Sequence, residues 1–324
     1  MTISRQRALR VAMLLVVVAL LAAFGRSVDW RATALVVRSA DPVLLGGALA
    51  LNLLSLVLKG VRWWVFLRPL GNVPLPLVLR ATFAGASLNN LVVAQGGEGA
   101  RVLLVSRAAG IPSAGVLAAL ALERVLDMVS YLVLLVGAAW MLELPDHVSQ
   151  WRAAAAGLLG LALVSLVGLG ATASRTTSAA PTGSTHPSGL GRRLAAYLRR
   201  VRGDVALVAS PRRLAAAMLL SLAAWSLQVA TYHLTARAAH LPLPLAGSVA
   251  AMLAVGISFL VRATPGNVGV FQVIYALTVR SFGIAEGAAV AAALLIQTVQ
   301  VVPTVVIGTL LAPRLLGGSR PRAS

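Results

Sequence analysis

The amino-acid sequence predicts an all-α protein, a polytopic transmembrane helical bundle. Hydrophobic residues make up 59% of the 324 positions, charged residues only 11%, and the mean hydropathy is +0.88. A soluble domain carries about 25% charged and about 45–50% apolar residues, so one soluble core could not contain this much apolar sequence. Because apolar runs recur along the chain, we expect about eight spans in a single integral membrane domain that covers residues 1–324.

Charge and cysteine content exclude several classes of function. The net charge is +19, from 28 Lys and Arg against 9 Asp and Glu, and there is no cysteine. The lack of cysteine excludes disulfides and thiolate metal sites, and the histidines show no metal-ligand spacing. Because the arginines lie in short loops between apolar runs, the charge indicates contact with anionic lipid and not with nucleic acid. No nucleotide-binding motif stands in a strand–helix context, so we expect no cofactor.

The expected spans follow one another along the chain. The basic N-terminus precedes an apolar run that is similar to a signal peptide, but the later spans favour an uncleaved first helix. The next runs, in order, are 42–58, 74–93, 112–142, 151–171, 214–236, 245–261, 271–282 and 287–312. The short runs 74–93 and 271–282 could either cross the membrane or re-enter it.

The distribution of arginine predicts the orientation. The turn 143–152 carries two acids and one arginine, which is typical of an outer turn. The loop 173–213 is flexible by composition in its first part and basic in its second. Lys59, Arg62 and Arg68 flank a tryptophan pair, as at a cytoplasmic membrane interface. We therefore place both termini and the loop 173–213 in the cytoplasm, at a cell (inner) membrane.

Two halves of the chain share a weak internal repeat. The tetrapeptide "PLPL" occurs at 74–77 and again at 242–245, and "GIPSAGVLAALALE" (110–123) parallels "GIAEGAAVAAALLIQ" (283–297). Between the members of each pair lies a Gly-rich segment, "QGGEG" or "TPGNVG", which predicts a helix break. Transporters often contain such repeats, with broken helices in matching positions near the substrate site.

Five charged residues are candidates for a polar pocket: Glu98, Arg101, Glu123, Arg124 and Asp127. Glu98 and Arg101 are one helical turn apart, and the two acids of "ERVLD" are four apart on one face, where like charges require a cation nearby. Counting about 20 residues back from the outer end of the helix 112–142 places these acids in its inner third. Charged groups at this depth in a membrane are costly, so a functional site is the first hypothesis for them. The alternative is a structural network that locks two helices together.

The Gly-rich segments supply the other candidate residues. Asn89 and Asn90 precede the first segment, and Pro265, Gly266 and Gly269 form the second. Irregular backbone at membrane depth is tolerated only inside protein or beside a cavity, so these residues could line a polar path. The alternative is an ordinary tight loop at the surface.

The motifs together resemble those of a known family. The series resembles the flippase-like family, also called the lysylphosphatidylglycerol synthase transmembrane region, over about residues 45–312. Its members resemble the membrane half of a bifunctional lysyl-lipid synthase and flippase, and some are linked to glycosyltransfer or polyprenyl-lipid pathways. The motif residues are Asn89-Asn90, Gly97-Glu98, Arg101, Arg107, Gly110, Glu123-Arg124, Asp127, Pro265-Gly266 and Gly269-Val270-Phe271.

The chain departs from the family pattern at a few positions. Val93 and Gln95 stand where the pattern has proline and arginine, and Asn267 and Gln272 replace a glycine and an acid of the second motif. The resemblance implies a soluble aminoacyltransferase domain in the bifunctional members. Since none follows the last span, we do not expect this chain to make lysyl-lipid by itself.

The leading functional prediction is a lipid flippase or translocase-like protein of the inner membrane, without catalytic residues. Its substrate would be a phospholipid or a polyprenyl-linked lipid, with arginines on a phosphate and carboxylates on a cationic or sugar group. One alternative is the membrane component of a lipid- or polyprenyl-dependent transferase, with Glu123 or Asp127 as base. Another is a non-catalytic membrane scaffold whose basic loop 191–213 docks a cytoplasmic enzyme.

Overall fold

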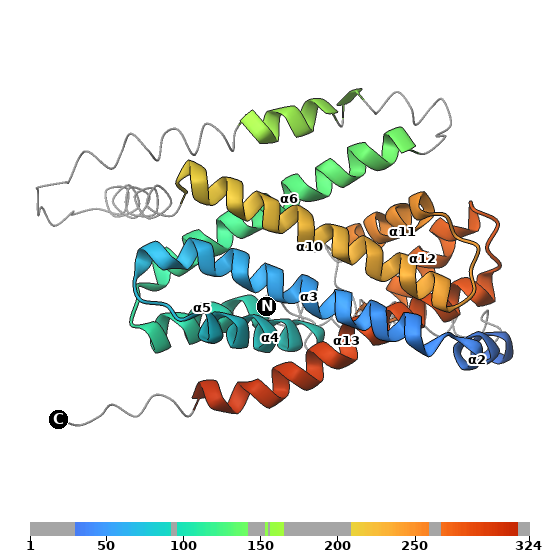
Figure 1. Cartoon of the computed structure of the whole chain (residues 1–324), viewed down its shortest axis with the longest axis horizontal. Coiled ribbons are helices and arrows are strands. Elements are labelled where there is room, and N and C mark those ends of the chain that lie inside the picture. Colours follow the sequence, from blue (N-terminus) through green and yellow to red (C-terminus); the bar gives the residue numbers. More distant parts are fainter. Residues whose placement is uncertain are drawn as a thin grey trace, which may run out of the picture. The chain divides into compact units, whose positions relative to one another are not determined.

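The computed structural model describes residues 30–91, 96–141, 153–154, 156–164, 209–258 and 267–316. Within these ranges the chain forms α-helices joined by short turns and contains no strand (Figure 1). The predicted all-α class is therefore confirmed. The expected first helix, the outer turn 143–152 and the loop 173–213 up to residue 208 lie outside the described residues.

The first and second halves of the chain each contain four helices whose lengths follow the same order. In each half a long helix is followed by two short ones and a second long one, which agrees with the predicted repeat. After α2 (Trp30–Ser39), the first half contains α3 (Pro42–Leu67), α4 (Leu75–Leu91), α5 (Gly96–Ala109) and α6 (Ser113–Met141). The second half contains α10 (Pro211–Ala238), α11 (Leu245–Ser258), α12 (Val270–Arg280) and α13 (Glu286–Leu316).

The turns before the last helix of each half are also alike. Gly110 and Gly283 have φ angles of 64° and 78°, a left-handed conformation that glycine adopts without a steric penalty. The isoleucine that follows each glycine is buried, with exposed fractions of 6% for Ile111 and 5% for Ile284. The matched strings "GIPSAG" and "GIAEG" therefore form the same turn and anchor it in the same way.

Helix α3 is longer than the sequence predicted. Asp41 caps its start, because one carboxylate oxygen accepts hydrogen bonds from the N–H groups of Val43 and Leu44 at 2.8 and 3.1 Å. The expected run ended at residue 58, but the helix continues to Leu67, since no helix breaker occurs before Pro69. This extension includes Lys59 and Arg62 in the helix. The sequence had placed both residues at a cytoplasmic membrane interface, after the end of the apolar run.

The segment "QGGEG" lies at a helix boundary, as predicted, because α4 ends at Leu91 and α5 begins at Gly96. Gly96, Gly97 and Gly99 lie in the first turn of α5, where backbone N–H groups need no intrahelical acceptor. Gly85 likewise lies within the continuous helix α4. The connection between α4 and α5 falls at residues 92–95, outside the described residues.

Three helical stretches in the described part of the chain are long and apolar enough to cross a membrane. They are Pro42–Leu70, Pro211–Ala238 and Glu286–Leu311, and two shorter apolar helices accompany them. The faces of the helices fit lipid contact: on α6, Leu117, Val125 and Met128 are exposed, whereas Leu122 and Leu126 are buried. An exposed apolar stripe beside a buried one is what a helix between protein and lipid requires.

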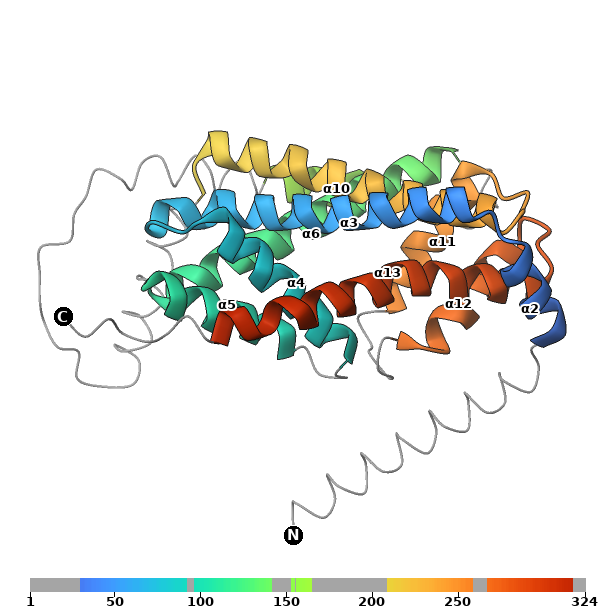
Figure 2. The ribbon, with the colours of Figure 1, turned by 60° about the horizontal axis from the view of Figure 1, so that its bottom comes forward.

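The chain divides into two compact units. One comprises residues 1–52, 89–95 and 228–303, and in it the short helices α11 and α12 pack against each other (Figure 2). Its buried aromatic group joins Tyr232 to Phe271 and Tyr275, with ring centroids 6.1 and 6.4 Å apart. We refer to this unit as the aromatic unit.

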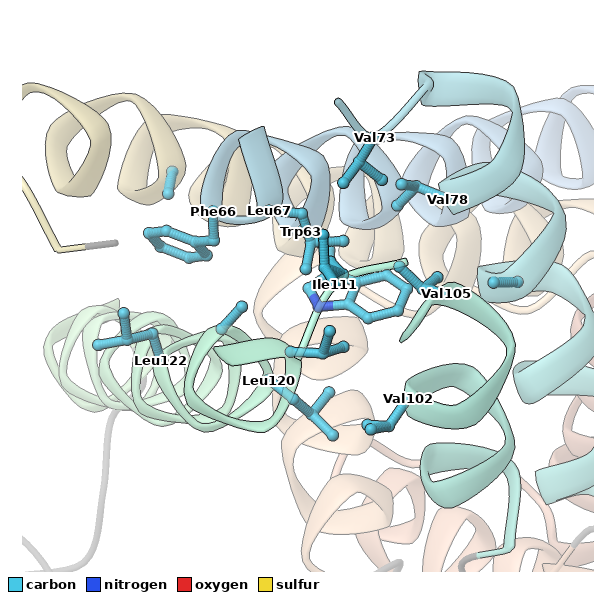
Figure 3. Close-up of a cluster of buried hydrophobic side chains, with 14 of the residues drawn as sticks. Trp63, Phe66, Leu67, Val73, Val78, Val102, Val105, Ile111, Leu120 and Leu122 are labelled. Atoms are coloured by element: carbon cyan, nitrogen blue, oxygen red, sulfur yellow. The ribbon is translucent and has the colours of Figure 1, made fainter. Parts of the chain in front are cut away.

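The other unit comprises residues 53–88, 96–227 and 304–324, and we refer to it as the charged unit. Its apolar core gathers Trp63, Phe66 and Leu67 of α3 against Val102 and Val105 of α5 (Figure 3). Residues of α4, α6 and α10 complete this core. The charged residues described below lie on these same helices.

Substituting Gly308 tests the close contact between α13 and α4. A Cβ atom at Gly308 would collide with Ser87 and with the backbone of Phe83, so Gly308→Leu should lower the free energy of unfolding by roughly 1–3 kcal/mol. Thermal unfolding in detergent measures the change. Gly137→Leu is the matched control, because nothing lies within 4 Å of a Cβ atom at Gly137, and an equal loss in both variants would contradict the contact.

Candidate functional site

A buried carboxylate on α6 joins three helices of the charged unit. One oxygen of Glu123 accepts a hydrogen bond from Arg62 of α3, and the other accepts one from Arg101 of α5, each at 3.1 Å. All three side chains are buried, with exposed fractions of 0% for Arg62, 2% for Glu123 and 4% for Arg101. Glu123 therefore bridges two buried guanidinium groups that come from different helices.

Arg62 also binds the second acid of α6. Its Nη1 atom donates to Asp127 Oδ1 at 2.7 Å and to Ser221 Oγ of α10 at 2.6 Å. The hydroxyl of Ser130 donates to the same Ser221 oxygen at 2.8 Å. One arginine thus holds both acids of the i,i+4 pair, which a helix alone could not tolerate.

The sequence did not identify Arg62 as a site residue. The sequence predicted only an interfacial position for Arg62, whereas the structure shows that α3 continues past it and that its side chain is buried in the unit. The like-charge pair on α6 required a cation, and Arg62 lies inside an otherwise apolar helix. These two observations together could have identified it.

The third acid of the network, Glu98, joins its partly exposed end. Glu98 accepts from Arg124 at 2.8 Å and from Arg101 at 3.4 Å. Arg124 also lies 3.5 Å from Asp127, and its side chain is 51% exposed. The five charged residues predicted as a pocket are therefore brought together, in one chain of ion pairs that runs from the exposed Arg124 to the buried Arg62.

An aromatic ring and a glycine position Arg101. Its guanidinium carbon lies 4.1 Å from the centroid of the Trp63 ring, a cation–π contact, and Trp63 is fully buried. On the other side, a Cβ atom at Gly85 of α4 would collide with the Arg101 side chain and with the carbonyl of Gly97. Only glycine at position 85 leaves room for Arg101.

Gly85→Leu should therefore displace Arg101 from Glu123. We expect the free energy of unfolding to fall by roughly 1–3 kcal/mol from overpacking, and thermal unfolding in detergent measures it. Gly99→Leu is the control, because a Cβ atom at Gly99 meets nothing within 4 Å. If both variants unfold at the temperature of the unaltered protein, the close passage of Arg101 is refuted.

A further cation lies beside Asp127. Trp225 of α10 donates its indole N–H to Asp127 Oδ1 at 3.3 Å, and the ammonium nitrogen of Lys59 lies 5.5 Å from the centroid of the same ring. Asp127 also attracts Lys59 electrostatically. Lys59 thus belongs to the surroundings of the network, although the sequence assigned it to an interface.

Three buried donors of the network have no hydrogen-bond partner among the described residues. They are the Nε atoms of Arg62 and Arg101 and the indole nitrogen of Trp63. Unpaired buried donors are costly. The cluster therefore contains buried hydrogen-bond donors that the described protein groups leave unsatisfied.

The other predicted site residues lie elsewhere. Asn89 and Asn90 are in the last turn of α4 and belong, like Gly269, to the aromatic unit. Pro265 and Gly266 lie outside the described residues. The structure thus brings together the charged candidates and does not place the Gly-rich candidates with them.

The aromatic unit contains an uncharged counterpart of the Arg101–Glu123 contact. Gly269, with a φ angle of 87°, donates its N–H to Gln272 Oε1 at 2.6 Å. Gln272 of α12 in turn donates to Gln297 Oε1 of α13 at 2.5 Å. Gln297 ends the string that parallels the one ending in Glu123. In both halves, therefore, a short helix is tied to the following long helix at this position, once by charges and once by amides.

Comparison with known proteins assigns the chain to a family. The chain is 27% identical to the protein named Glycosyltransferase AglD of Haloferax volcanii over 336 aligned residues, which cover 92% of this chain and 53% of that protein. It spans about half the length of this curated relative. Residues 9–308 match the family described as the lysylphosphatidylglycerol synthase TM region. This multi-pass membrane protein therefore belongs to the lysylphosphatidylglycerol synthase transmembrane region family.

Proposed function

We propose that this protein binds the anionic head group of a phospholipid or polyprenyl-linked lipid at the charge network and moves it across a cell (inner) membrane. The observation that carries the proposal is an excess of positive charge. Four cations against three acids leave one unbalanced positive charge: Lys59, Arg62, Arg101 and Arg124 against Glu98, Glu123 and Asp127.

An unbalanced positive charge in this partly buried network favours an anionic ligand. Removing a charge from water without a partner costs several kcal/mol, and a bound phosphate would supply the missing negative charge. Guanidinium groups bind phosphate oxygens through paired hydrogen bonds. The unpaired Nε donors of Arg62 and Arg101 would contribute to such binding.

The gradient of exposure suggests the order of contacts. Arg124 is half exposed, Glu98 and Asp127 are 22% and 17% exposed, and Arg62 is buried. A head group would first meet Arg124 and displace Glu98 from it. Exchange of partners along the network would then pass the phosphate toward Arg101 and Arg62 without leaving any guanidinium unpaired.

Reconstitution into liposomes tests the proposal. Purified protein should accelerate the transbilayer movement of labelled phosphatidylglycerol or of a labelled polyprenyl phosphate, relative to protein-free vesicles, and should move phosphatidylcholine less. Protein carrying Glu286→Gln, a change at an exposed acid outside the network, serves as the matched control and should remain active. Absence of movement above empty vesicles for every anionic lipid would refute the function.

A transferase component is the second candidate, because the relative AglD is named a glycosyltransferase. In that case Glu123 or Asp127 would serve as a base for a polyprenyl-linked donor. Cells with Glu123→Gln would then change in lipid or glycan composition, while lipid movement by the purified variant stays intact. Loss of movement in the purified variant would favour the translocase.

A further inference from the structure

A cavity separate from the charge network lies at the ends of two apolar helical stretches of the charged unit. It has a volume of about 360 Å³ and is lined by Val65, Arg68, Pro69 and Arg213. The stretch Pro42–Leu70 ends at this cavity, and the stretch Pro211–Ala238 begins there. The cavity is therefore at a level where a membrane-spanning segment meets the head-group region.

We propose that this cavity binds a phosphate group, supplied by the head group of a membrane lipid. Ligand pockets have volumes of about 300–1,000 Å³, so a cavity of about 360 Å³ has room for a phosphate with a small head group. Among the described residues that line it, two of four are arginines, whose guanidinium groups match the geometry of phosphate oxygens. Val65 and Pro69 offer an apolar wall on which the glycerol part of a lipid can lie.

Arg68 is held in place without the use of its hydrogen-bond donors. Its guanidinium carbon lies 4.8 Å from the centroid of the Trp64 ring, and Trp64 is fixed because its indole nitrogen donates to the carbonyl of Val73 at 2.8 Å. None of the ion pairs among the described residues includes Arg68. A cation–π contact with tryptophan uses none of the guanidinium N–H donors, so they can bind an anion.

Arg213 adds a second positive group from another helix. It lies in the first turn of α10, where the helix dipole also favours an anion. Its neighbour Arg212 is exposed and does not line the cavity. A general preference for basic residues at a membrane interface would apply to both arginines, whereas a phosphate site requires only Arg213.

Lipid retention tests the site. Full-length protein is purified in detergent with equal amounts of phosphatidylglycerol and phosphatidylcholine, and bound lipid is counted by native mass spectrometry. The unaltered protein should retain phosphatidylglycerol preferentially, and Arg68→Gln/Arg213→Gln should weaken its affinity for it about tenfold or more. The matched control Arg212→Gln/Arg280→Gln removes two exposed arginines and should retain the lipid.

Two further measurements make the test decisive. Val65→Phe fills the cavity without a change of charge and should also reduce retention. Added inorganic phosphate, compared with chloride at equal ionic strength, should displace the lipid.

An equal loss in the control double variant, or full retention by both the Val65→Phe and the double arginine variants, would overturn the proposal. Phosphate binding without lipid retention would overturn the lipid as its source. Lipid movement by the Arg68→Gln/Arg213→Gln protein should persist, because both residues lie outside the charge network, so a failure of this site is distinguishable from a failure of the proposed transport.

Discussion

Replacing Glu123 by glutamine is expected to lower the free energy of unfolding by roughly 3–5 kcal/mol and to abolish lipid movement. Glutamine keeps the shape of the side chain but removes the charge between Arg62 and Arg101, which lie within 3.1 Å of its two oxygens. Its amide N–H₂ group also faces one of the two guanidinium groups, and no hydrogen bond can form there because a guanidinium has no acceptor. Thermal unfolding in detergent and movement of labelled phosphatidylglycerol in liposomes measure the two effects.

The matched control is Glu286→Gln, because Glu286 is exposed at the start of α13. It makes the same chemical change and should leave both measurements within experimental error. If Glu123→Gln unfolds at the same temperature as the control, Glu123 does not hold the two arginines together as described.

The double variant Arg62→Met/Glu123→Met is expected to recover much of the stability lost in Glu123→Gln but none of the lipid movement. Replacing a buried ion pair by apolar residues of similar volume is often neutral or stabilising, by about 1–4 kcal/mol. Asp127 keeps Arg124 and Trp225 as partners, and Arg101 keeps Glu98. A double-mutant cycle on the free energy of unfolding, with both methionine single variants, measures the coupling.

This variant separates the two interpretations of the network. A purely structural lock between α3, α5 and α6 would be replaced by apolar packing, and lipid movement would return together with stability. A head-group site would stay inactive, because the guanidinium that binds the phosphate is gone. Recovery of movement in the double variant would therefore refute the proposed site.

Most of the fold could be predicted from the sequence, because bilayer thickness constrains apolar segments strongly. The long helix expected at 112–142 is α6, and the run 214–236 is α10. The end of α3 was missed because Lys59 and Arg62 were interpreted as the edge of the membrane. Charged residues end a hydropathy window but do not end a helix, and α3 continues to Leu67, shortly before Pro69.

The site could be predicted only in part. Glu98, Arg101, Glu123, Arg124 and Asp127 were found because charges are rare and costly in this sequence, and the structure places them in contact. The partners from α10 could not be found in this way, because a serine or a tryptophan in an apolar helix is ordinary. Only the folded arrangement brings Ser221 to Arg62 and Trp225 to Asp127.

The matched helix contacts of the two halves, one made by charged and one by neutral side chains, respond differently to an electric field. Moving one elementary charge across a membrane is worth about 2.3 kcal/mol per 100 mV. A shift of the Arg101–Glu123 region along the membrane normal would therefore be biased by the membrane potential through its excess charge. The same shift of the Gln272–Gln297 contact would be insensitive to voltage, so the potential acts on one of the two matched contacts and not on the other.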